Sequence, residues 1–304
     1  MKTLYVSDLD GTLLRSSERT SDFTNRTINE LVEQGVLFSY ATARSYVTAH
    51  KVTQGLHARI PVIIYNGAFI RDHVSGEILL SSYFGDGAEA EALLKELLDA
   101  DVYPLVYATF SGDSRASIED GQSERNHHGE DERGQEGDFY EKFSYIPQRA
   151  TEGMRRFLDT RKGDERERAV STVEELMDGD IFYFTCIDER EKLAAICERY
   201  RERYHCVLSQ EIYTKDWFLE IMPLATSKAR AVMRLKEYLG CDRVVAFGDH
   251  YNDIDMFEVA DEAYAVENAV EELKAAATGV IASNDDDGVA HFLRERLSEF
   301  LGKA

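Results

Sequence analysis

Apolar runs alternate with amphipathic stretches over the first and last thirds of the chain. Segment 24–34 places its apolar residues on one face of a helix, and Gly35 is the expected end of that helix. A similar pattern predicts a helix over 226–239, ending at Gly240. Short, almost uninterrupted apolar runs are typical of strands buried on both faces of a parallel sheet. Such runs lie at 4–6, 36–44, 61–70, 243–247, 262–266 and 279–283.

The middle of the chain has a different hydrophobic pattern, which predicts more paired strands. A helix is expected near 88–98 and another near 193–200, with strands over 102–110, 180–188, 206–214 and 217–222. Segment 111–138 is mostly charge, Gly and Ser, so we expect a solvated loop there, His127 and His128 included. The predicted fold class is therefore α/β: a Rossmann-like parallel-sheet core (1–82 and 223–304) interrupted by an inserted α+β domain (83–222).

Charge and composition narrow the function. The 304 residues carry 57 acids against 35 bases, a formal net charge of −22, which argues against a nucleic-acid partner and against anionic membranes. The first residues are too polar for a signal peptide, and no apolar stretch approaches 18 residues, so a soluble cytoplasmic protein is expected. The four cysteines show no C-x-x-C spacing, which favours free thiols.

Polar side chains follow several of the predicted strands, at the sheet edge where α/β proteins bind ligands. Carboxylates gathered there need a cation, and oxygen ligands shared with a phosphate suit Mg²⁺. A carboxylate near bound metal and a lysine stays ionised and can act as a nucleophile. The residues concerned are Asp8, Asp10, Thr42, Arg44, Asn66, Gly67, Asp249, Asn252 and Asp253, with Lys228 at a helix start.

These residues also carry a resemblance. "DLDGT" at 8–12, Thr42, Lys228 in "TSKARAV" and "GDHYNDIDM" at 248–256 resemble, in this order, the four motifs of the haloacid dehalogenase superfamily. The inserted middle, "YNGAF" at 65–69 and "NDDDGVA" at 284–290 resemble its Cof-type branch, which has an α/β (C2-type) cap. The resemblance implies a Mg²⁺-dependent phosphatase of sugar phosphates or phosphorylated cofactors. It implies a small phosphomonoester as partner, and we expect a monomer or small homo-oligomer.

Roles for single residues follow from the resemblance. It implies that Asp8 is the nucleophile that forms an aspartyl phosphate, and that Asp10 is the general acid and base. It implies metal binding by Asp8, the Asp10 backbone carbonyl, Asp249 and Asp253. It further implies phosphate or substrate binding by Leu9, Gly11, Thr42, Arg44, Asn66, Gly67, Lys228 and Asn252. The residues themselves leave alternatives open: Arg44 could pair with substrate or with any surface acid, Asn66 could merely cap a turn, and Asn252 could orient Lys228 or Asp253.

Some features depart from the family or leave alternatives open. His250 and Tyr251 follow Asp249, where the family commonly has a small residue, and Ala229 and Glu267 stand where it often has Gly. The acidic run 285–287 is expected to be a solvated helix N-terminus. Two other functions are alternatives: a phosphomutase of the phosphomannomutase type, which needs a basic cap, and a non-catalytic phospho-ligand-binding protein, which is expected to lack Asp8 or Asp10.

Overall fold

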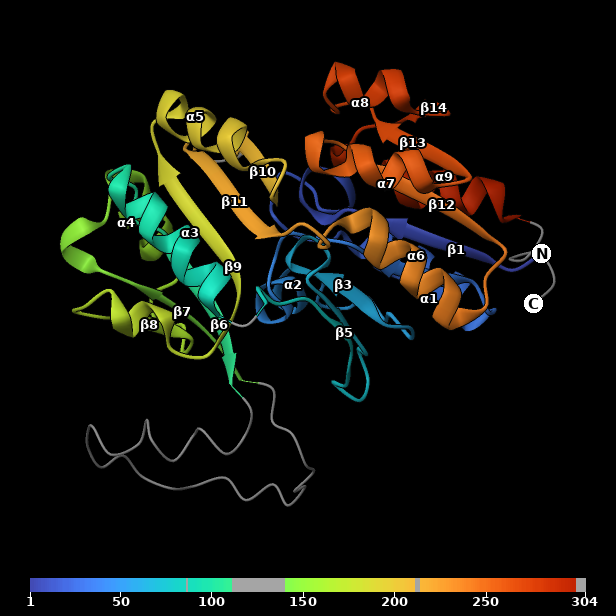
Figure 1. The fold of residues 1–304 in the computed structure, drawn as a ribbon. Helices are drawn as coiled ribbons and strands as arrows, with labels where there is room; N and C mark the ends of the chain where they lie inside the picture. Colours follow the sequence, from blue (N-terminus) through green and yellow to red (C-terminus); the bar gives the residue numbers. More distant parts are fainter. Residues whose placement is uncertain (86, 111–139, 211–213, 299–304) are drawn as a thin grey trace. The chain divides into compact units, whose positions relative to one another are not determined.

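The computed structural model describes residues 1–85, 87–110, 140–210 and 214–298. The described chain forms two compact units (Figure 1). The first contains Met1–Ser82, Arg203–Val207 and the chain from Leu224 onward, and the second contains Tyr83–Glu202 and Leu208–Pro223. The expected loop at 111–138 lies outside the described residues. Within the described part of the chain, no helix is both long enough and apolar enough to cross a bilayer.

A five-stranded parallel sheet forms the centre of the first unit, in the order β14-β13-β12-β1-β2. Its central strands are buried at almost every position, as expected for strands covered on both faces. The strands are β1 (Thr3–Ser7), β2 (Leu37–Tyr40), β12 (Arg243–Gly248), β13 (Glu262–Val266) and β14 (Gly279–Ile281).

The strand order places the two acidic motifs side by side. β1 pairs with β12 although they are far apart in sequence, and Ser7 lies opposite Phe247. The chain order reverses at this pair, because β2 lies on one side of β1 and β12 on the other. Ligands in open α/β sheets bind beyond the carboxyl ends of the strands at such a reversal. Asp8 and Asp249 directly follow these two strands.

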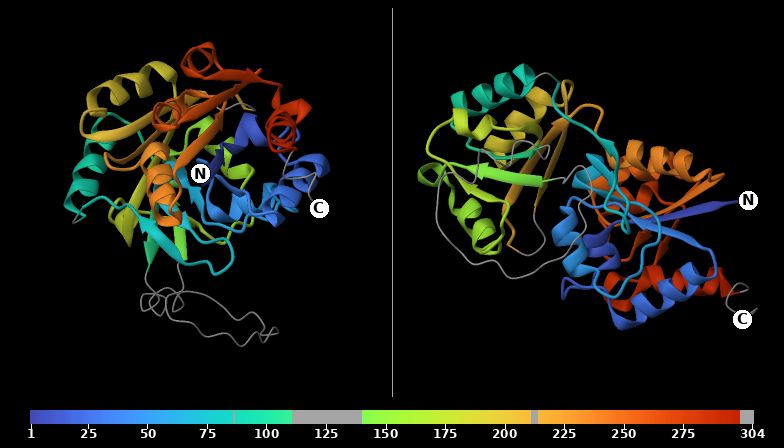
Figure 2. Two further views of the ribbon diagram at one scale, coloured as in Figure 1. Left: turned by 90° about the vertical axis from the view of Figure 1, so that its right-hand side faces the viewer. Right: turned by 90° about the horizontal axis from the view of Figure 1, so that it is seen from below.

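Helices cover both faces of this sheet (Figure 2). α1 and α9 pack together on one face, and α6 packs with α7 on the other. α1 buries Ile28, Leu31 and Val32, and the Ser21 side chain caps it by accepting a hydrogen bond from the Thr24 amide. The helices are α1 (Asp22–Glu33), α2 (Tyr46–Val52), α6 (Lys228–Leu239), α7 (Ile254–Val259), α8 (Glu271–Ala276) and α9 (Gly288–Arg296).

The apolar run 61–70 divides into two strands. β3 (Val62–Ile64) and β4 (Phe69–Arg71) pair antiparallel, and β5 (Ile78–Ser81) completes a small three-stranded sheet. Ile63 also bridges to Ala41, which places this sheet beside β2. The turn Tyr65–Gly67 separates β3 from β4, and it contains Asn66 and Gly67, which interrupt the apolar run.

The second unit is built on a six-stranded sheet in the order β10-β11-β9-β6-β7-β8, mostly antiparallel, with β7 and β8 parallel. α5 packs against β9 and β11, and α4 packs against β9. Its elements are α3 (Ala88–Asp99), β6 (Leu105–Phe110), β7 (Tyr140–Tyr145), α4 (Glu152–Asp159), β8 (Glu167–Ala169), β9 (Asp180–Asp188), α5 (Arg190–Tyr200) and β11 (Trp217–Pro223). β10 (Tyr204–Gln210) begins in the first unit and continues in the second from Leu208.

The predicted α/β fold class with a parallel core is confirmed. The paired strands expected in the middle of the chain are present as β6, β9, β10 and β11. β7 and β8 were not predicted, because their apolar residues are few and irregularly spaced. α4 was also missed, although Met154, Phe157 and Leu158 have the spacing of one helix face. The role of 83–222 as a cap stays a prediction.

Candidate active site

Lys228 and two aspartates form a buried ionic cluster beyond the ends of β1 and β12. The Lys228 ammonium donates to Asp8 Oδ1 at 2.6 Å and to Asp253 Oδ1 at 2.7 Å. All three side chains are at most 7% exposed. Lys228 is the first residue of α6, where the Ser227 side chain caps the helix by accepting from the Arg230 amide. The start of this helix therefore fixes where the ammonium lies.

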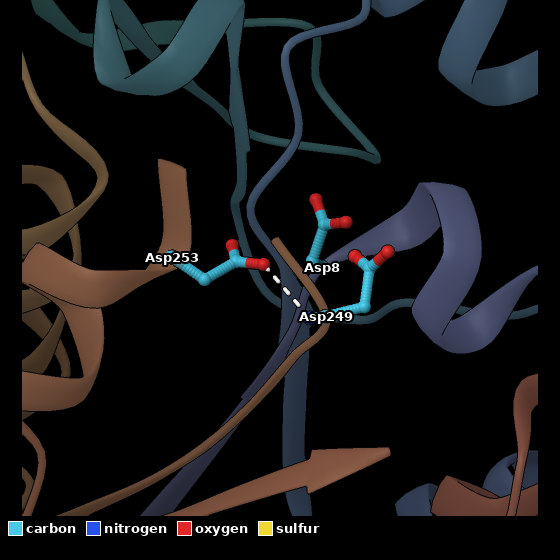
Figure 3. Close-up of side chains that lie close together, drawn as sticks. All are labelled: Asp8, Asp249 and Asp253. Atoms are coloured by element: carbon cyan, nitrogen blue, oxygen red, sulfur yellow. Dashed lines mark hydrogen bonds between the residues drawn. The ribbon is translucent and has the colours of Figure 1, made fainter. Parts of the chain in front are cut away.

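Asp249 completes the cluster on the other side of Asp8 (Figure 3). The Thr12 hydroxyl donates to Asp249 Oδ1 at 3.0 Å, and the Asp249 amide donates to Asp253 Oδ2 at 3.0 Å. Carboxylate oxygens of Asp8, Asp249 and Asp253 all lie within 4.8 Å of one another. Three carboxylates thus face one ammonium inside a buried site.

Gly11 lets the loop after β1 pass close to Asp249. Its φ is +73°, and a Cβ at this position would lie 2.2 Å from Asp249 Oδ2. Any other residue would clash with the carboxylate and would strain the backbone. The motif "DLDGT" therefore needs glycine for the packing of the site as well as for the turn.

The crowding of acids changes their protonation. Burial raises the pKa of Asp8 to about 7; the Lys228 ammonium opposes this shift, and the Asp253 and Asp10 carboxylates add to it. Burial, followed by Asp8 and Asp253, raises the pKa of Asp249 well above its ordinary value. Burial disfavours the charged form of Lys228, but the Asp253 and Asp8 carboxylates outweigh this and raise its pKa. The buried site therefore disfavours the ionised forms of Asp8 and Asp249 unless a further positive charge enters it.

Asp10 faces Arg44, outside the group of three carboxylates. Arg44 Nε donates to Asp10 Oδ2 at 2.7 Å, and a terminal guanidinium nitrogen donates to Asp10 Oδ1 at 2.5 Å. Of the two pairings left open for Arg44, the structure shows the one with an acid. Thr42 is fully buried, and its hydroxyl oxygen accepts from the Arg44 amide at 3.1 Å.

Asn66 and Asn252 contact each other across the site. Asn252 Nδ2 donates to Asn66 Oδ1 at 3.4 Å, and Asn66 is 1% exposed. Gly67 lies against Ser227, the cap of the Lys228 helix. The Leu9 side chain is fully buried in the core, so only its backbone is available to a ligand. His250, next to Asp249, donates its amide to Asp253 Oδ2 at 3.2 Å, and the Tyr251 side chain is exposed.

Three residues that shape the site were not predicted. Thr12 orients Asp249, Asn268 Nδ2 donates to the Gly11 carbonyl at 2.7 Å, and Asn284 Nδ2 donates to the Leu14 carbonyl at 2.9 Å. Thr12 could have been found, because it closes the "DLDGT" motif. Asn284 opens the stretch "NDDDGVA" that carried part of the resemblance, but no role was predicted for it. Asn268 is an ordinary turn residue by sequence and gave no signal.

The run 285–287 is not uniformly solvated, so that prediction was wrong for its last residue. Asp287 is 6% exposed and accepts hydrogen bonds from Arg15 and from the Thr24 hydroxyl. Asp285 is exposed and accepts from Ser16. Arg15 and Ser16 come from the loop between β1 and α1, and Thr24 comes from the first turn of α1. All three lie more than 260 residues earlier, so no local pattern could reveal these contacts.

Comparison with known proteins identifies the family. The chain matches the haloacid dehalogenase-like hydrolase family over residues 5–293. It therefore belongs to the haloacid dehalogenase-like hydrolases, as the resemblance predicted, and it is a phosphatase, that is, a phosphoric monoester hydrolase of this family.

The similarity to individual relatives extends over almost the whole chain. The chain is similar to the 5-amino-6-(5-phospho-D-ribitylamino)uracil phosphatase YwtE of Bacillus subtilis, with 30% identity over 98% of this chain and 99% of that one. It is 26% identical to the phosphatase YitU of the same organism, named for the same substrate, over 97% of each chain. A solved haloacid dehalogenase-like hydrolase from B. subtilis has the same fold, with a TM-score of 0.72, 23% identity, and coverage of 97% of this chain and 99% of that one.

Proposed function

We propose that this phosphatase hydrolyses small phosphorylated metabolites in a Mg²⁺-dependent reaction that passes through an aspartyl phosphate on Asp8. The observation that supports this most is the buried contact of Asp8 with Lys228, inside a group of three carboxylates. A buried carboxylate held beside an ammonium is ready to attack an electrophile, and the same ammonium can neutralise an incoming phosphate.

In the proposed reaction, an Asp8 oxygen attacks phosphorus and the bond to the leaving oxygen breaks. Asp10 donates a proton to that oxygen. Water then attacks the phosphorus, Asp10 takes its proton, and the Asp8 carboxylate is released together with phosphate. Such positioned proton transfer typically contributes 10²- to 10⁴-fold. Lys228, the Thr42 hydroxyl and the backbone of Leu9 and Gly11 hold the phosphate oxygens.

The donor set fits a hard divalent cation. Asp8, Asp249 and Asp253 offer only carboxylate oxygens, close enough to share one ion. When all three carboxylates are ionised, their charges against the single charge of Lys228 leave two negative charges to be balanced, which is the charge of Mg²⁺. When bound, the ion would neutralise the phosphate oxygens and keep Asp8 ionised. The Asp10 carbonyl is proposed as a further ligand.

We propose a substrate in which the phosphate is carried by a sugar or a sugar-like chain. The names of YwtE and YitU, which describe the phosphate ester of a ribitylamino-uracil, support this class. Asn66, Gly67 and Asn252 are proposed to face the substrate. Residues 83–222 are proposed as the cap that selects it. A cytoplasmic location and a monomer or small homo-oligomer remain expectations.

The test is a phosphate-release screen with sugar phosphates, nucleotides and phosphorylated cofactor precursors, including the substrate named for YwtE. We expect hydrolysis of at least one monophosphate, lost with EDTA and restored by Mg²⁺. Rapid-quench mass spectrometry should find a phosphate adduct on the peptide that contains Asp8, and Asp8→Asn should abolish both adduct and turnover. Asp99→Asn, an exposed acid in α3, is the matched control. Turnover by Asp8→Asn would contradict the mechanism, and no turnover of a folded wild type would favour the binding-protein alternative.

A further inference from the structure

The pairing of Arg44 with Asp10 gives Arg44 a role different from the substrate binding that the family resemblance implied. Asp10 is the most exposed of the four site carboxylates, with 28% of its side chain accessible, and its contact is with Arg44. Both oxygens of its carboxylate accept from the guanidinium, at 2.7 and 2.5 Å. A two-point contact of this kind fixes the plane of a carboxylate as well as its position.

The backbone and the side chain of Arg44 are both restrained by neighbouring residues. Its amide donates to the Thr42 hydroxyl at 3.1 Å, and its carbonyl accepts from the Tyr65 amide at 3.0 Å. Its side chain is 16% exposed, and Glu18 Oε2 lies 3.8 Å from the same terminal nitrogen that contacts Asp10. Because the backbone and the side chain of Arg44 are both restrained, its guanidinium has a fixed position and orientation beside Asp10.

We propose that Arg44 is a positioning residue that orients the Asp10 carboxyl group for proton transfer, and that it does not bind the phosphate of the substrate. A carboxylate has two lone pairs on each oxygen, so one remains on each after Arg44 has bound. The remaining lone pairs point away from the guanidinium, and the 28% exposure of the Asp10 side chain leaves the carboxyl group accessible. The inference rests on the proposed function, because it assumes that Asp10 is the acid and base.

The proton balance shows what would be lost. In the first step Asp10 gives its proton to the leaving oxygen as the phosphorus–oxygen bond breaks, and in the second it accepts one from the attacking water. Without Arg44 the carboxyl group of Asp10 can rotate. The proton is then less often directed at the leaving oxygen when the phosphorus–oxygen bond breaks. Misplacement of a reacting group by about 1 Å can cost up to 10²-fold in rate. Substrate binding should be unaffected.

The test measures the effect of Arg44→Met twice. It compares Arg44→Met with wild type, and it compares the double variant Arg44→Met/Asp10→Asn with Asp10→Asn alone. The substrates are the best alkyl phosphate from the screen and p-nitrophenyl phosphate, whose leaving group needs little protonation. We expect Arg44→Met to lower kcat on the alkyl phosphate about 10- to 100-fold, with KM within about threefold, and to lower kcat less on the aryl phosphate. In the Asp10→Asn background the same change should cost under about threefold, because residues that act together are non-additive. Arg44→Lys should restore part of kcat.

Glu18→Gln is the control that removes the charge of a second acid near Arg44, and it should leave kcat near that of wild type. A raised KM with unchanged kcat, equal in both backgrounds, would overturn the inference and assign Arg44 to the substrate. Equal losses on both substrates and in both backgrounds, with a lowered unfolding midpoint, would overturn it in favour of a structural role. If Arg44→Met does not fold, the milder Arg44→Gln serves for the same comparison. An inactive wild type would overturn both this inference and the proposed function, whereas an active wild type unaffected by Arg44→Met would overturn the inference alone.

Discussion

The surroundings of acidic side chains in the first unit shift their pKa values in opposite directions. Asp8 is buried and shares one ammonium with Asp253, and its pKa rises to about 7. Glu262 in β13 instead accepts hydrogen bonds from Arg296 at 2.5 and 2.7 Å, from Arg243 at 2.6 Å and from the Tyr264 hydroxyl at 2.6 Å. The bonds from Arg296 are the largest cause of a pKa lowered to about 2. Burial therefore disfavours the ionised form of Asp8 in the site. The hydrogen bonds of Glu262 favour its ionised form, so that Glu262 stabilises the fold.

The lowered pKa of Glu262 predicts a pH-dependent contribution to stability. The ordinary value is 4.5 and the folded value about 2, so the contribution is complete above pH 4.5 and is lost as the pH falls toward 2. Glu262→Gln should lower the free energy of unfolding by about 1 kcal/mol at pH 7, since the partly exposed group is screened by solvent. Denaturant unfolding of both proteins between pH 7 and pH 3 measures this difference, which should shrink below pH 4.5.

Glu295→Gln, at an exposed position of α9, is the matched control and should give a small difference at every pH. A difference for Glu262→Gln that stayed constant from pH 7 to pH 3 would show that the carboxylate charge is not what stabilises the protein.

At the scale of elements, the turn Tyr65–Gly67 links β3 and β4 to the helix that carries Lys228. Its three residues have φ values of +50°, +52° and +96°, a left-handed run that only glycine adopts without strain. The Tyr65 amide bonds to the Arg44 carbonyl and the Asn66 amide to the Thr42 carbonyl, which holds the turn against the segment after β2. Strain in this turn is therefore maintained by contacts with neighbouring parts of the site.

Gly67→Ala tests how closely this turn is packed against α6. A Cβ on Gly67 would lie 2.2 Å from the Ser227 carbonyl oxygen, which is backbone and cannot turn aside. The positive φ alone should cost about 1 to 2 kcal/mol, and the overlap about 1 to 3 kcal/mol more. Because Ser227 caps the helix that begins at Lys228, kcat should fall as well. Denaturant unfolding and phosphate release measure the two effects.

Gly35→Ala is the matched control, since Gly35 has a φ of +92° and a Cβ there would meet nothing within 4 Å. It should cost only the backbone term and leave kcat unchanged. Equal losses of stability in the two variants would mean that α6 moves freely to accommodate the methyl group.

On the scale of the whole molecule, periodicity predicted elements well where the chain buries a full face. The runs of β1, β9 and β12 are almost wholly apolar and lie where they were expected. β7 was missed because "YEKFSY" mixes charge with aromatics, and its Glu141 and Lys142 are buried through ion pairs with Arg166 and Asp178. Pairing of this kind is set by distant residues and leaves no local pattern.

The same distinction holds for the candidate site. Asp8, Asp249, Asp253 and Lys228 lie together as strand ends and a helix start predicted, because parallel strands bring their carboxyl ends to one edge. The sequence left the partner of Arg44 open and did not reveal the contacts of Asn268 or Asp287. Each depends on the direction of one side chain in a loop, which hydrophobic periodicity does not encode.

The last prediction concerns the metal, and the net charge of −22 sets its control. Any salt should stabilise so acidic a chain by screening repulsion, so Mg²⁺ must be compared with Na⁺ at equal ionic strength. An ion that binds among Asp8, Asp249 and Asp253 stabilises only the folded state, by about 2.7 kcal/mol when its concentration is 100 times its Kd. We expect a higher unfolding midpoint in Mg²⁺ than in matched Na⁺ for wild type. Asp249→Asn should lose that difference while keeping its response to Na⁺, because it removes one carboxylate of the group but only one of the 57 acidic residues of the chain. Equal midpoints in the two salts for wild type would mean that Mg²⁺ acts on the chain only through screening, and would remove the metal from the proposed reaction.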